Sequence, residues 1–254
     1  MNTANGEDSR GELWICRLGK VPYLEAVAMQ QHVQALRQRE EIPDVLLLLE
    51  HPPVFTRGRR SRDEELPLGE DFYRARGVEV IATNRGGRIT YHGPGQIVGY
   101  PIMRIQNTHV HLRKIEEAIL SALAGEGIRG RSRCAEGPDY TGVWVENRKI
   151  ASIGVHVARG VSTHGFAVNV DNDLAPFSWV IACGLPDTQM TSVAEELDAP
   201  HSDGVESFRL HLAEHFCDAH SLRPKLVTGA ALGLPAAVAG GPRAERILEE
   251  ALAK

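Results

Sequence analysis

Hydrophobic residues recur along the chain at two spacings, and each spacing predicts a different kind of element. Apolar side chains three to four positions apart predict helices over residues 21–40, 70–77, 112–128 and 206–222. Runs rich in apolar and β-branched residues predict strands at 14–19, 45–49 and 78–84, and a series of strands over 141–170. Because helices and strands are mixed, and hairpins crowd the second half, we expect a mixed sheet rather than a purely parallel one.

The run "VLLLL" at 45–49 is the longest compact apolar stretch. It is far shorter than the roughly 20 residues that cross a membrane, so no membrane association is expected. Its uninterrupted apolar character is typical of a strand covered on both faces. Among the later strands, residues 146–148 and 158–160 are the expected turns, and Gly77 is the expected end of the short helix.

Both ends of the chain differ in composition from the middle. Residues 1–11 are polar and acidic, which argues against a signal peptide and predicts a loose tail. Residues 223–254 are predicted to be a flexible extension, because the last 27 residues are rich in Ala, Gly and Pro. Within that extension, residues 243–254 have a helical pattern.

Composition narrows the possible functions. The 254 residues are 43% hydrophobic and 24% charged, as in an ordinary soluble globular protein. A net charge of −5 argues against a general electrostatic grip on nucleic acid, so no nucleic-acid partner is expected. The four cysteines form no CxxC pair, which argues against a disulfide framework and against a zinc ribbon. We therefore expect a cytoplasmic location.

The stretch "RGGRITYHGPGQIVGYPI" at 85–102 combines five glycines with strand-forming residues. Glycines permit sharp turns and close approach of main chain to a ligand, and a tight hairpin with structural glycines is the alternative. No GK[ST] follows and no G-x-G-x-x-G opens a helix, so neither a P-loop nor a dinucleotide site is indicated. Arg85 and Arg88 are candidates for binding an anion, and His92 is a weaker catalytic candidate.

Several blocks together resemble the lipoyl(octanoyl) transferases. Besides 85–102, the blocks are "EHPPVFTRGR" (50–59), "RKIASIGVHVARGVSTHGFAVNV" (148–170) and "FSWVIACGL" (177–185), in the family's order. The resemblance covers residues 12–222, which we take as the catalytic domain. It implies an α/β (α+β) fold like that of lipoate and biotin protein ligases: a large mixed sheet flanked by helices, with a smaller accessory sheet.

The resemblance also implies an activity. Such enzymes take an octanoyl group from acyl carrier protein and deliver it to a lysine of a lipoyl domain, in 2-oxoacid dehydrogenase complexes or the glycine cleavage H protein. This is the first step of endogenous protein lipoylation. No cofactor and no metal are implied, because phosphopantetheine arrives on the acyl carrier protein.

The family pattern assigns roles to individual residues. Cys183 in "ACGL" matches the cysteine that carries the acyl group as a thioester, and Lys149 in "KIASIG" matches its lysine partner. The implied substrate-binding residues are Arg85, Gly86, Gly87, Arg88, Ile89, Thr90, Tyr91, His92, Ser152, Ile153, Gly154, Gly165, Phe166 and Ala167. Main-chain N–H groups near Gly154 or Gly165 are candidates for stabilising an oxyanion.

Elementary chemistry agrees with these roles. Transfer from a thioester to an amine runs downhill without ATP, and a covalent intermediate divides it into two easier steps. The nucleophile is a thiolate, which a neighbouring ammonium favours, and a neutral amine can later accept a proton from the incoming lysine. Acidic partner proteins favour a basic docking rim that includes Arg57, Arg59, Arg60 or Arg88.

Two other functions remain open on the sequence alone. An ATP-dependent lipoate or biotin ligase of the same fold needs no nucleophilic cysteine, although the GRGRxGR-type loop of biotin ligases is missing. A non-catalytic acyl-binding module would keep the pocket but form no adduct. The pairs His109/His111 and His211/His215 favour a metal site only weakly, since no acidic third ligand is placed beside them.

Overall fold

The protein is described by a computed structural model over residues 10–185, 188–197 and 204–235. Its large sheet consists of β1 (Glu12–Lys20), β2 (Asp44–Glu50), β6 (Gln96–Ile102), β7 (Arg131–Ser132), β8 (Gly142–Val145), β9 (Arg148–Ala158), β10 (Val161–Asn169), β11 (Gln189–Met190) and β12 (Arg223–Val227). The strand order is β12-β1-β2-β6-β10-β9-β8-β7, and β11 pairs with β9. β1 is parallel to both its neighbours, whereas β2 and β6 pair antiparallel, so the predicted mixed sheet is confirmed.

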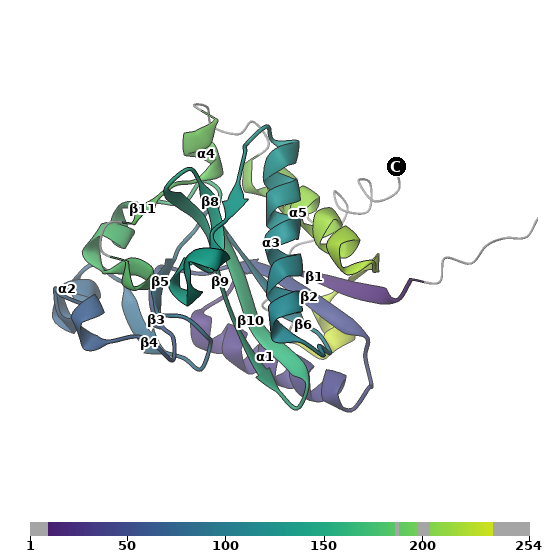
Figure 1. Cartoon of the computed structure of the whole chain (residues 1–254). Coiled ribbons are helices and arrows are strands. Elements are labelled where there is room, and N and C mark those ends of the chain that lie inside the picture. The colour runs from purple at the N-terminus through teal and green to yellow at the C-terminus, as the bar shows by residue number, and fades with distance from the viewer. Residues whose placement is uncertain (1–9, 186–187, 198–203, 236–254) are drawn as a thin grey trace, which may run out of the picture.

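A second, smaller sheet and two groups of helices complete the molecule (Figure 1). The small sheet consists of β3 (Val54–Arg57), β4 (Glu79–Ala82) and β5 (Ile89–His92), in the order β4-β3-β5. The α-helices are α1 (Tyr23–Gln38), α2 (Glu70–Ala75), α3 (Thr108–Gly125), α4 (Val193–Glu196) and α5 (Gly204–His220). Short 3₁₀ turns are η1 (Asp63–Glu65), η2 (Cys134–Glu136), η3 (Pro138–Tyr140), η4 (Ala175–Trp179), η5 (Ala182–Gly184) and η6 (Gly229–Leu232).

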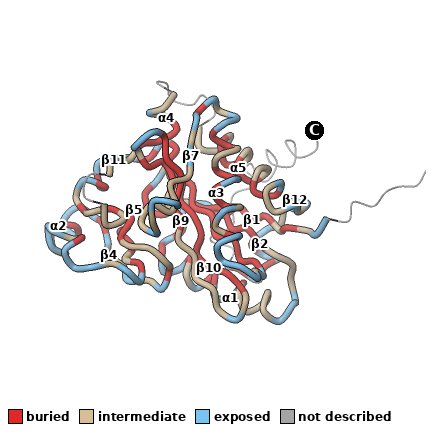
Figure 2. The backbone as a smooth tube through the Cα atoms, in the orientation of Figure 1, coloured by how far each residue is buried: buried red, intermediate tan, exposed pale blue. Residues whose placement is uncertain are grey.

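The large sheet has a hydrophobic core on each face. Leu46 and Leu48 of β2 pack with the buried side chains of α3 and α5, whereas Val45 and Leu47 pack with those of α1. Successive side chains of a strand point to opposite faces, so a strand that is covered on both sides must be apolar at every position. This explains the "VLLLL" run, and Figure 2 shows the central strands buried along their length. In the described part of the chain, no helix is long and apolar enough to span a membrane.

The predicted helices and strands are confirmed, with one notable shift. Helix α3 begins at Thr108, four residues before the predicted start. The side chain of Asn107 accepts hydrogen bonds from the backbone N–H groups of His109 and Val110, which satisfies two donors that a helix leaves unpaired. An N-cap of this kind lies outside the apolar periodicity, so the periodicity alone placed the start too late.

The glycine-rich stretch 85–102 does not form a hairpin. Its first strand, β5, pairs with β3 in the small sheet, and its second, β6, lies between β2 and β10 in the large sheet. The stretch therefore connects the two sheets. At its start, Gly86 N–H donates to Val155 O of β9 at 3.0 Å, so the main chain of the loop rests against the large sheet.

The predicted domain end at residue 222 is too early. Residues 223–227 form β12, which pairs in parallel with β1 at the edge of the large sheet. Beyond it, Leu232 and Leu234 are buried in the core on the α1 face. The small and flexible residues around them concealed these apolar contacts. The rest of the predicted tails, residues 1–9 and 236–254 with the proposed terminal helix, lies outside the described residues.

Candidate active site

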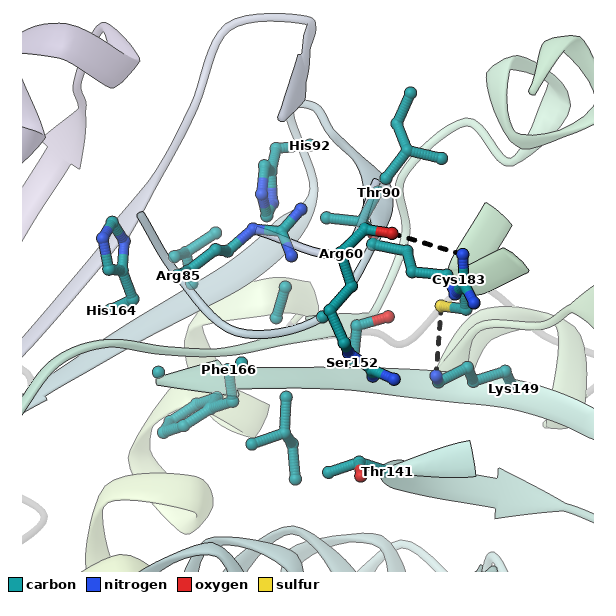
Figure 3. Close-up of a pocket in the computed structure, with 18 of the residues that line it drawn as sticks. Arg60, Arg85, Thr90, His92, Thr141, Lys149, Ser152, His164, Phe166 and Cys183 are labelled. Carbon is teal, nitrogen blue, oxygen red and sulfur yellow. Dashed lines mark hydrogen bonds between the residues drawn. The ribbon is translucent and has the colours of Figure 1, made fainter. Parts of the chain in front are cut away.

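A pocket lies where the small sheet meets β6, β9 and β10 of the large sheet (Figure 3). The small sheet contributes Thr90 and His92, and the strands of the large sheet contribute most of the opposite wall. Turn η5 reaches the pocket because its neighbours are anchored below the small sheet, where Phe177, Val180 and Ala182 pack in one hydrophobic cluster. Residues from five separate parts of the chain thus meet in one pocket.

Lys149 and Cys183 meet at one end of this pocket. Although 34 positions separate them, Lys149 Nζ lies 3.1 Å from Cys183 Sγ. The lysine is only 2% exposed, while Cys183 remains partly accessible. Among the described residues, no carboxylate forms an ion pair with Lys149. Cys183 Sγ is thus the polar atom that the Lys149 amine contacts.

The strand register fixes the position of Lys149. It lies near the start of β9, between Trp144 of β8 and Met190 of β11, and its Nζ lies 5.2 Å from the centre of the Trp144 ring. Gly142 makes room for the lysine side chain: a Cβ at residue 142 would lie 2.9 Å from Lys149 Cε. Gly142 also has φ +135°, a backbone conformation that other residues rarely adopt. Glycine is therefore required beside the lysine.

Cys183 sits on an unusual backbone. Its φ is +57° and that of Gly184 is +69°, so two successive residues occupy the left-handed region. For a non-glycine residue this conformation costs on the order of 1–3 kcal/mol and clusters at functional sites. The sharp turn that results presents the sulfur to Lys149.

An ion cluster holds the cysteine turn in place. Arg88 donates to Glu65 at 2.8 Å and to Asp139 at 3.1 Å, and its side chain lies so close to Gly184 that a Cβ there would overlap it. Glu65 is buried, and its backbone carbonyl accepts a hydrogen bond from Ile181 N. Two neighbours of the cysteine are thus tied to one arginine–glutamate pair. In this structure Arg88 positions the turn instead of presenting a free guanidinium to an anion.

Arg85 is a buried cation beside the pocket. Its guanidinium donates to Thr56 Oγ1 at 2.8 Å, to Thr56 O at 2.6 Å and to Gly86 O at 3.0 Å. Burial lowers the pKa of this guanidinium from its usual value. In the described part of the chain it forms no ion pair with a carboxylate, so neutral oxygens alone hold it at the pocket wall.

Three buried histidines surround the same region. His92 hydrogen-bonds Gln96 Oε1 at 2.8 Å, and His164 hydrogen-bonds Asn84 Oδ1 at 2.7 Å. His51 lies between Val21 O and the Tyr100 hydroxyl. Burial lowers the pKa of all three rings, of His51 to about 4 and of His164 to about 3. All three rings are therefore neutral at pH 7. His92 and His164 line the pocket (Figure 3), and the ring of His51 packs against that of His92.

Small residues line the face of the large sheet at the pocket. Ser152 pairs with Ala167, and Gly154 pairs with Gly165, across β9 and β10. Since alternate residues share a face, these four residues lie together on the face of the large sheet that the small sheet covers. The shallow surface that they form leaves space for an extended chain beginning at Cys183.

The structure brings together most of the residues that the sequence assigned to the site. Those lining the pocket are Arg85, Gly87, Arg88, Ile89, Thr90, His92, Lys149, Ser152, Ile153, Gly154, Gly165, Phe166, Ala167 and Cys183. Gly86 lines a neighbouring cavity instead. Tyr91, predicted to bind substrate, does not line the pocket. Because side chains alternate along β5, its ring points into the hydrophobic cluster that contains Phe55 and Phe177.

Several residues that shape the site had no role in the sequence interpretation. Glu65 and Asp139 bind Arg88, which lies far from both along the chain, whereas Gly142 and Trp144 contact Lys149, a few residues further on. No motif marks Glu65 or Asp139. For Gly142, the isolated glycine at the start of a predicted strand was an available signal of close approach.

The predicted basic rim is largely neutralised. Arg57 pairs with Asp63, Arg60 with Asp139, and Arg88 with Glu65. Of the four predicted arginines, only Arg59 forms no ion pair within the described ranges. The histidine pairs were considered as metal ligands. Of these histidines, His211 contacts Glu126. The described part of the chain contains no group of three or more His, Cys, Asp or Glu side chains that could hold a metal ion.

Comparisons with known proteins agree with this fold and pocket. Residues 22–217 match the model of the lipoyl protein ligase A/B catalytic domain family. The chain is 47% identical over 196 residues to an octanoyltransferase of Rubrobacter xylanophilus, covering 75% of this chain and 87% of that protein. It is 46% identical over 187 residues to an octanoyltransferase of Acidothermus cellulolyticus, covering 70% and 80%.

Solved structures share the architecture at low sequence identity. A putative lipoate protein ligase from T. acidophilum superposes with a TM-score of 0.65 at 17% identity, covering 96% of this chain and 93% of that one. Lipoate-protein ligase A bound with ATP gives 0.63 at 15% identity, covering 96% and 95%. These likenesses establish the fold, and they leave the chemistry of this site to its own residues.

Proposed function

Since the chain belongs to the lipoyl protein ligase A/B catalytic domain family, we propose that it is an octanoyltransferase that works through a thioester on Cys183. The donor is octanoyl-acyl carrier protein and the acceptor is a lysine of a lipoyl domain. The observation that carries the proposal is the 3.1 Å contact between Lys149 Nζ and Cys183 Sγ inside a pocket. The relatives named octanoyltransferases support the acyl group.

In the first half-reaction, the Cys183 thiolate attacks the carbonyl carbon of the donor thioester. The new C–S bond forms as the bond to the phosphopantetheine sulfur breaks, and that sulfur leaves with a proton from the Lys149 ammonium. Lys149 is placed to deliver this proton, because its Nζ lies 3.1 Å from Cys183 Sγ. The products are octanoyl-Cys183, the free donor thiol and a neutral Lys149 amine.

In the second half-reaction, the amine of the acceptor lysine attacks the Cys183 thioester. A C–N bond forms, the C–S bond breaks, and neutral Lys149 accepts the proton that the attacking nitrogen loses. This step restores the original thiolate and ammonium. Lys149 thus serves as the acid in the first half-reaction and as the base in the second. Both roles agree with its burial beside the sulfur, where no carboxylate among the described residues pairs with it.

The small-residue surface formed by Ser152, Gly154, Gly165 and Ala167 suits the acyl chain. Burial of a methylene group contributes about 0.8 kcal/mol, so six methylenes contribute about 5 kcal/mol. No nucleotide is needed, because the thioester already supplies an activated acyl group. The cofactor requirement is therefore nil, and phosphopantetheine enters as part of the donor.

Intact-mass spectrometry tests the proposal directly. Mixing the protein with octanoyl-acyl carrier protein should add one octanoyl group, which peptide mapping should locate at Cys183 and which lipoyl domain should remove. Cys183→Ser should abolish the adduct, whereas Cys217→Ser, which changes a thiol in the core under α3 and α5 and lines neither cavity, should retain it. Absence of any adduct together with ATP-dependent acylation of lipoyl domain would identify a ligase. Binding without an adduct or ATP-dependent product would identify an acyl-binding module.

A further inference from the structure

A second cavity opens beside the acyl pocket, and nothing in the proposed mechanism has yet used it. It lies between the N-terminal half of α3, the segment 134–141 and β9. Its lining shares six residues with the acyl pocket: Arg60, Gly87, Pro138, Thr141, Ile153 and Gly154. The two cavities are therefore neighbours across a common boundary.

The wall formed by β9 offers backbone hydrogen-bonding groups. From Ile153 onward, β9 pairs only with β10 among the described strands, because β8 and β11 pair with it no further than Ser152. Ile153, Gly154 and Val155 line the cavity along this edge, where Val155 O already accepts a hydrogen bond from Gly86 N–H. The part of the edge that no described strand or loop amide covers therefore lies at Ile153. An unpaired strand edge presents N–H and C=O groups that can bond to amides of a bound molecule.

The other walls combine apolar and cationic side chains. Leu112 of α3 lines the cavity with Val155, and Arg60 and Arg113 lie on its rim. Both arginines keep much of their side chain exposed, 41% for Arg60 and 53% for Arg113. The one carboxylate in the lining, Glu116, is 3% exposed and already accepts hydrogen bonds from Arg113 and Ser132. Arg60 likewise pairs with Asp139, which is 25% exposed, so in both ion pairs the arginine is the more exposed partner.

We infer that this second cavity is the binding groove for the phosphopantetheine arm of the acyl donor. The arm carries two amides for the β9 edge, a pair of geminal methyl groups for the Leu112–Val155 wall, and a phosphate for Arg60 and Arg113. The inference rests on the proposed function, and it adds that the donor arm and the acyl chain occupy different cavities. Cys183 and Lys149 line the acyl pocket but not the second cavity, so the thioester end of the arm crosses the common boundary to reach them.

A series of donors with progressively shorter arms tests the groove. The rate of Cys183 acylation is measured with octanoyl-phosphopantetheine, octanoyl-pantetheine and octanoyl-N-acetylcysteamine, which deliver the same acyl group. We expect kcat/KM to fall at each truncation, by about fivefold for loss of the phosphate, as exposed charge pairs contribute modestly. Equal rates with all three donors would overturn the inference.

Variants locate the effect in the molecule. Arg113→Gln should lower kcat/KM about fivefold with octanoyl-phosphopantetheine and leave octanoyl-pantetheine unaffected. Lys114→Gln, the same charge change one position along α3 and outside the cavity lining, is the matched control. Thr108→Trp should obstruct the groove from an exposed position and slow acylation by both donors. Thermal melting shows whether each variant remains folded.

Separation of the two half-reactions distinguishes this inference from the proposed function. Enzyme preloaded with octanoate on Cys183 should transfer it to lipoyl domain at the normal rate in Arg113→Gln and Thr108→Trp. If these variants instead slow only this transfer, the groove belongs to the acceptor and the inference is wrong. If they change neither half-reaction, it is also wrong. Failure of the wild-type protein to become acylated by any donor would instead refute the proposed function itself.

Discussion

Two buried regions of the large sheet, the core under α3 and α5 and the part of β9 and β10 under the small sheet, bury different kinds of side chain. On the face covered by α3 and α5, Leu48, Ile119 and Phe216 belong to one continuous apolar core. On the opposite face, where the small sheet covers β9 and β10, the buried side chains include Arg85 and His164. Burial thus stabilises the first region through the hydrophobic effect, and in the second it costs free energy that hydrogen bonds must offset.

The comparison shows how the site is supported. A rigid apolar core on one face holds β9 in place, and the other face of the same strand can then carry Lys149 and a surface of small residues. Changes on the pocket face are expected to alter catalysis, and changes on the α3/α5 face are expected to alter stability. Each prediction below tests this division, beginning with the largest effect.

Lys149→Ala should slow acyl transfer by about 100-fold or more, the usual contribution of a positioned acid–base group. Without Lys149, no positioned group supplies the proton that the departing donor sulfur takes up. Single-turnover mass spectrometry compares the acylation rates of the variant and the wild type. Lys225→Ala, an exposed lysine on β12, is the control and should behave as wild type. A Lys149→Ala rate equal to that of the wild type would contradict the assigned role.

Leu48→Ala should lower the free energy of unfolding by about 2–5 kcal/mol, since it leaves a cavity in the apolar core. Urea denaturation measures this loss. At temperatures where the variant remains folded, its acylation rate per molecule should match the wild type. A large loss of rate in fully folded protein would show that the two faces are not separable.

Ala167→Val should fill part of the small-residue surface and shift acyl preference toward shorter chains. Two methylenes of burial correspond to about tenfold in binding, so the ratio of octanoyl to hexanoyl transfer should fall by about that factor. Competition between the two donors, resolved by the mass of the Cys183 adduct, measures the ratio. An unaltered ratio would place the acyl chain elsewhere.

Acid should destabilise the protein through its buried histidines on both faces. Burial lowers the pKa of His51, His111 and His220 to about 4 and that of His164 to about 3, whereas an unfolded histidine titrates near 6.5. Between pH 6.5 and 4 the unfolded chain therefore binds more protons than the folded chain, so the free energy of unfolding decreases as the pH is lowered. At pH 5.5 the expected loss is about 1 kcal/mol per histidine.

Urea denaturation at pH 7.5 and 5.5 measures this loss. His111→Gln should reduce the pH dependence by the contribution of one histidine, while His109→Gln, an exposed histidine on the same helix, should leave it unchanged. A stability that does not vary between these two pH values would contradict the neutral, buried state of the four rings.

The sequence predicted elements well where periodicity carries the information, as in β2 and α5. It predicted Lys149, Cys183 and most pocket residues through a resemblance that spans several blocks, because each residue alone is ambiguous. It failed where a side chain acts through long-range contacts: Glu65 and Asp139 carry no local signal of their bonds to Arg88. Tyr91 was misassigned because a contiguous block ignores the alternation of side chains along β5.

The edge strand β12 has a practical consequence for anyone who shortens this protein. A fragment cut at the limits of the matched family, residues 22–217, would lack both β1 and β12 and would leave β2 uncovered. A fragment that ends at residue 222 would keep β1 but lack β12, which would leave the backbone of residues 12–16 without its partner strand. Such bare edges recruit other chains, so both truncations should aggregate. Expression to at least residue 235 keeps β12 paired with β1 and keeps Leu232 and Leu234 in the core.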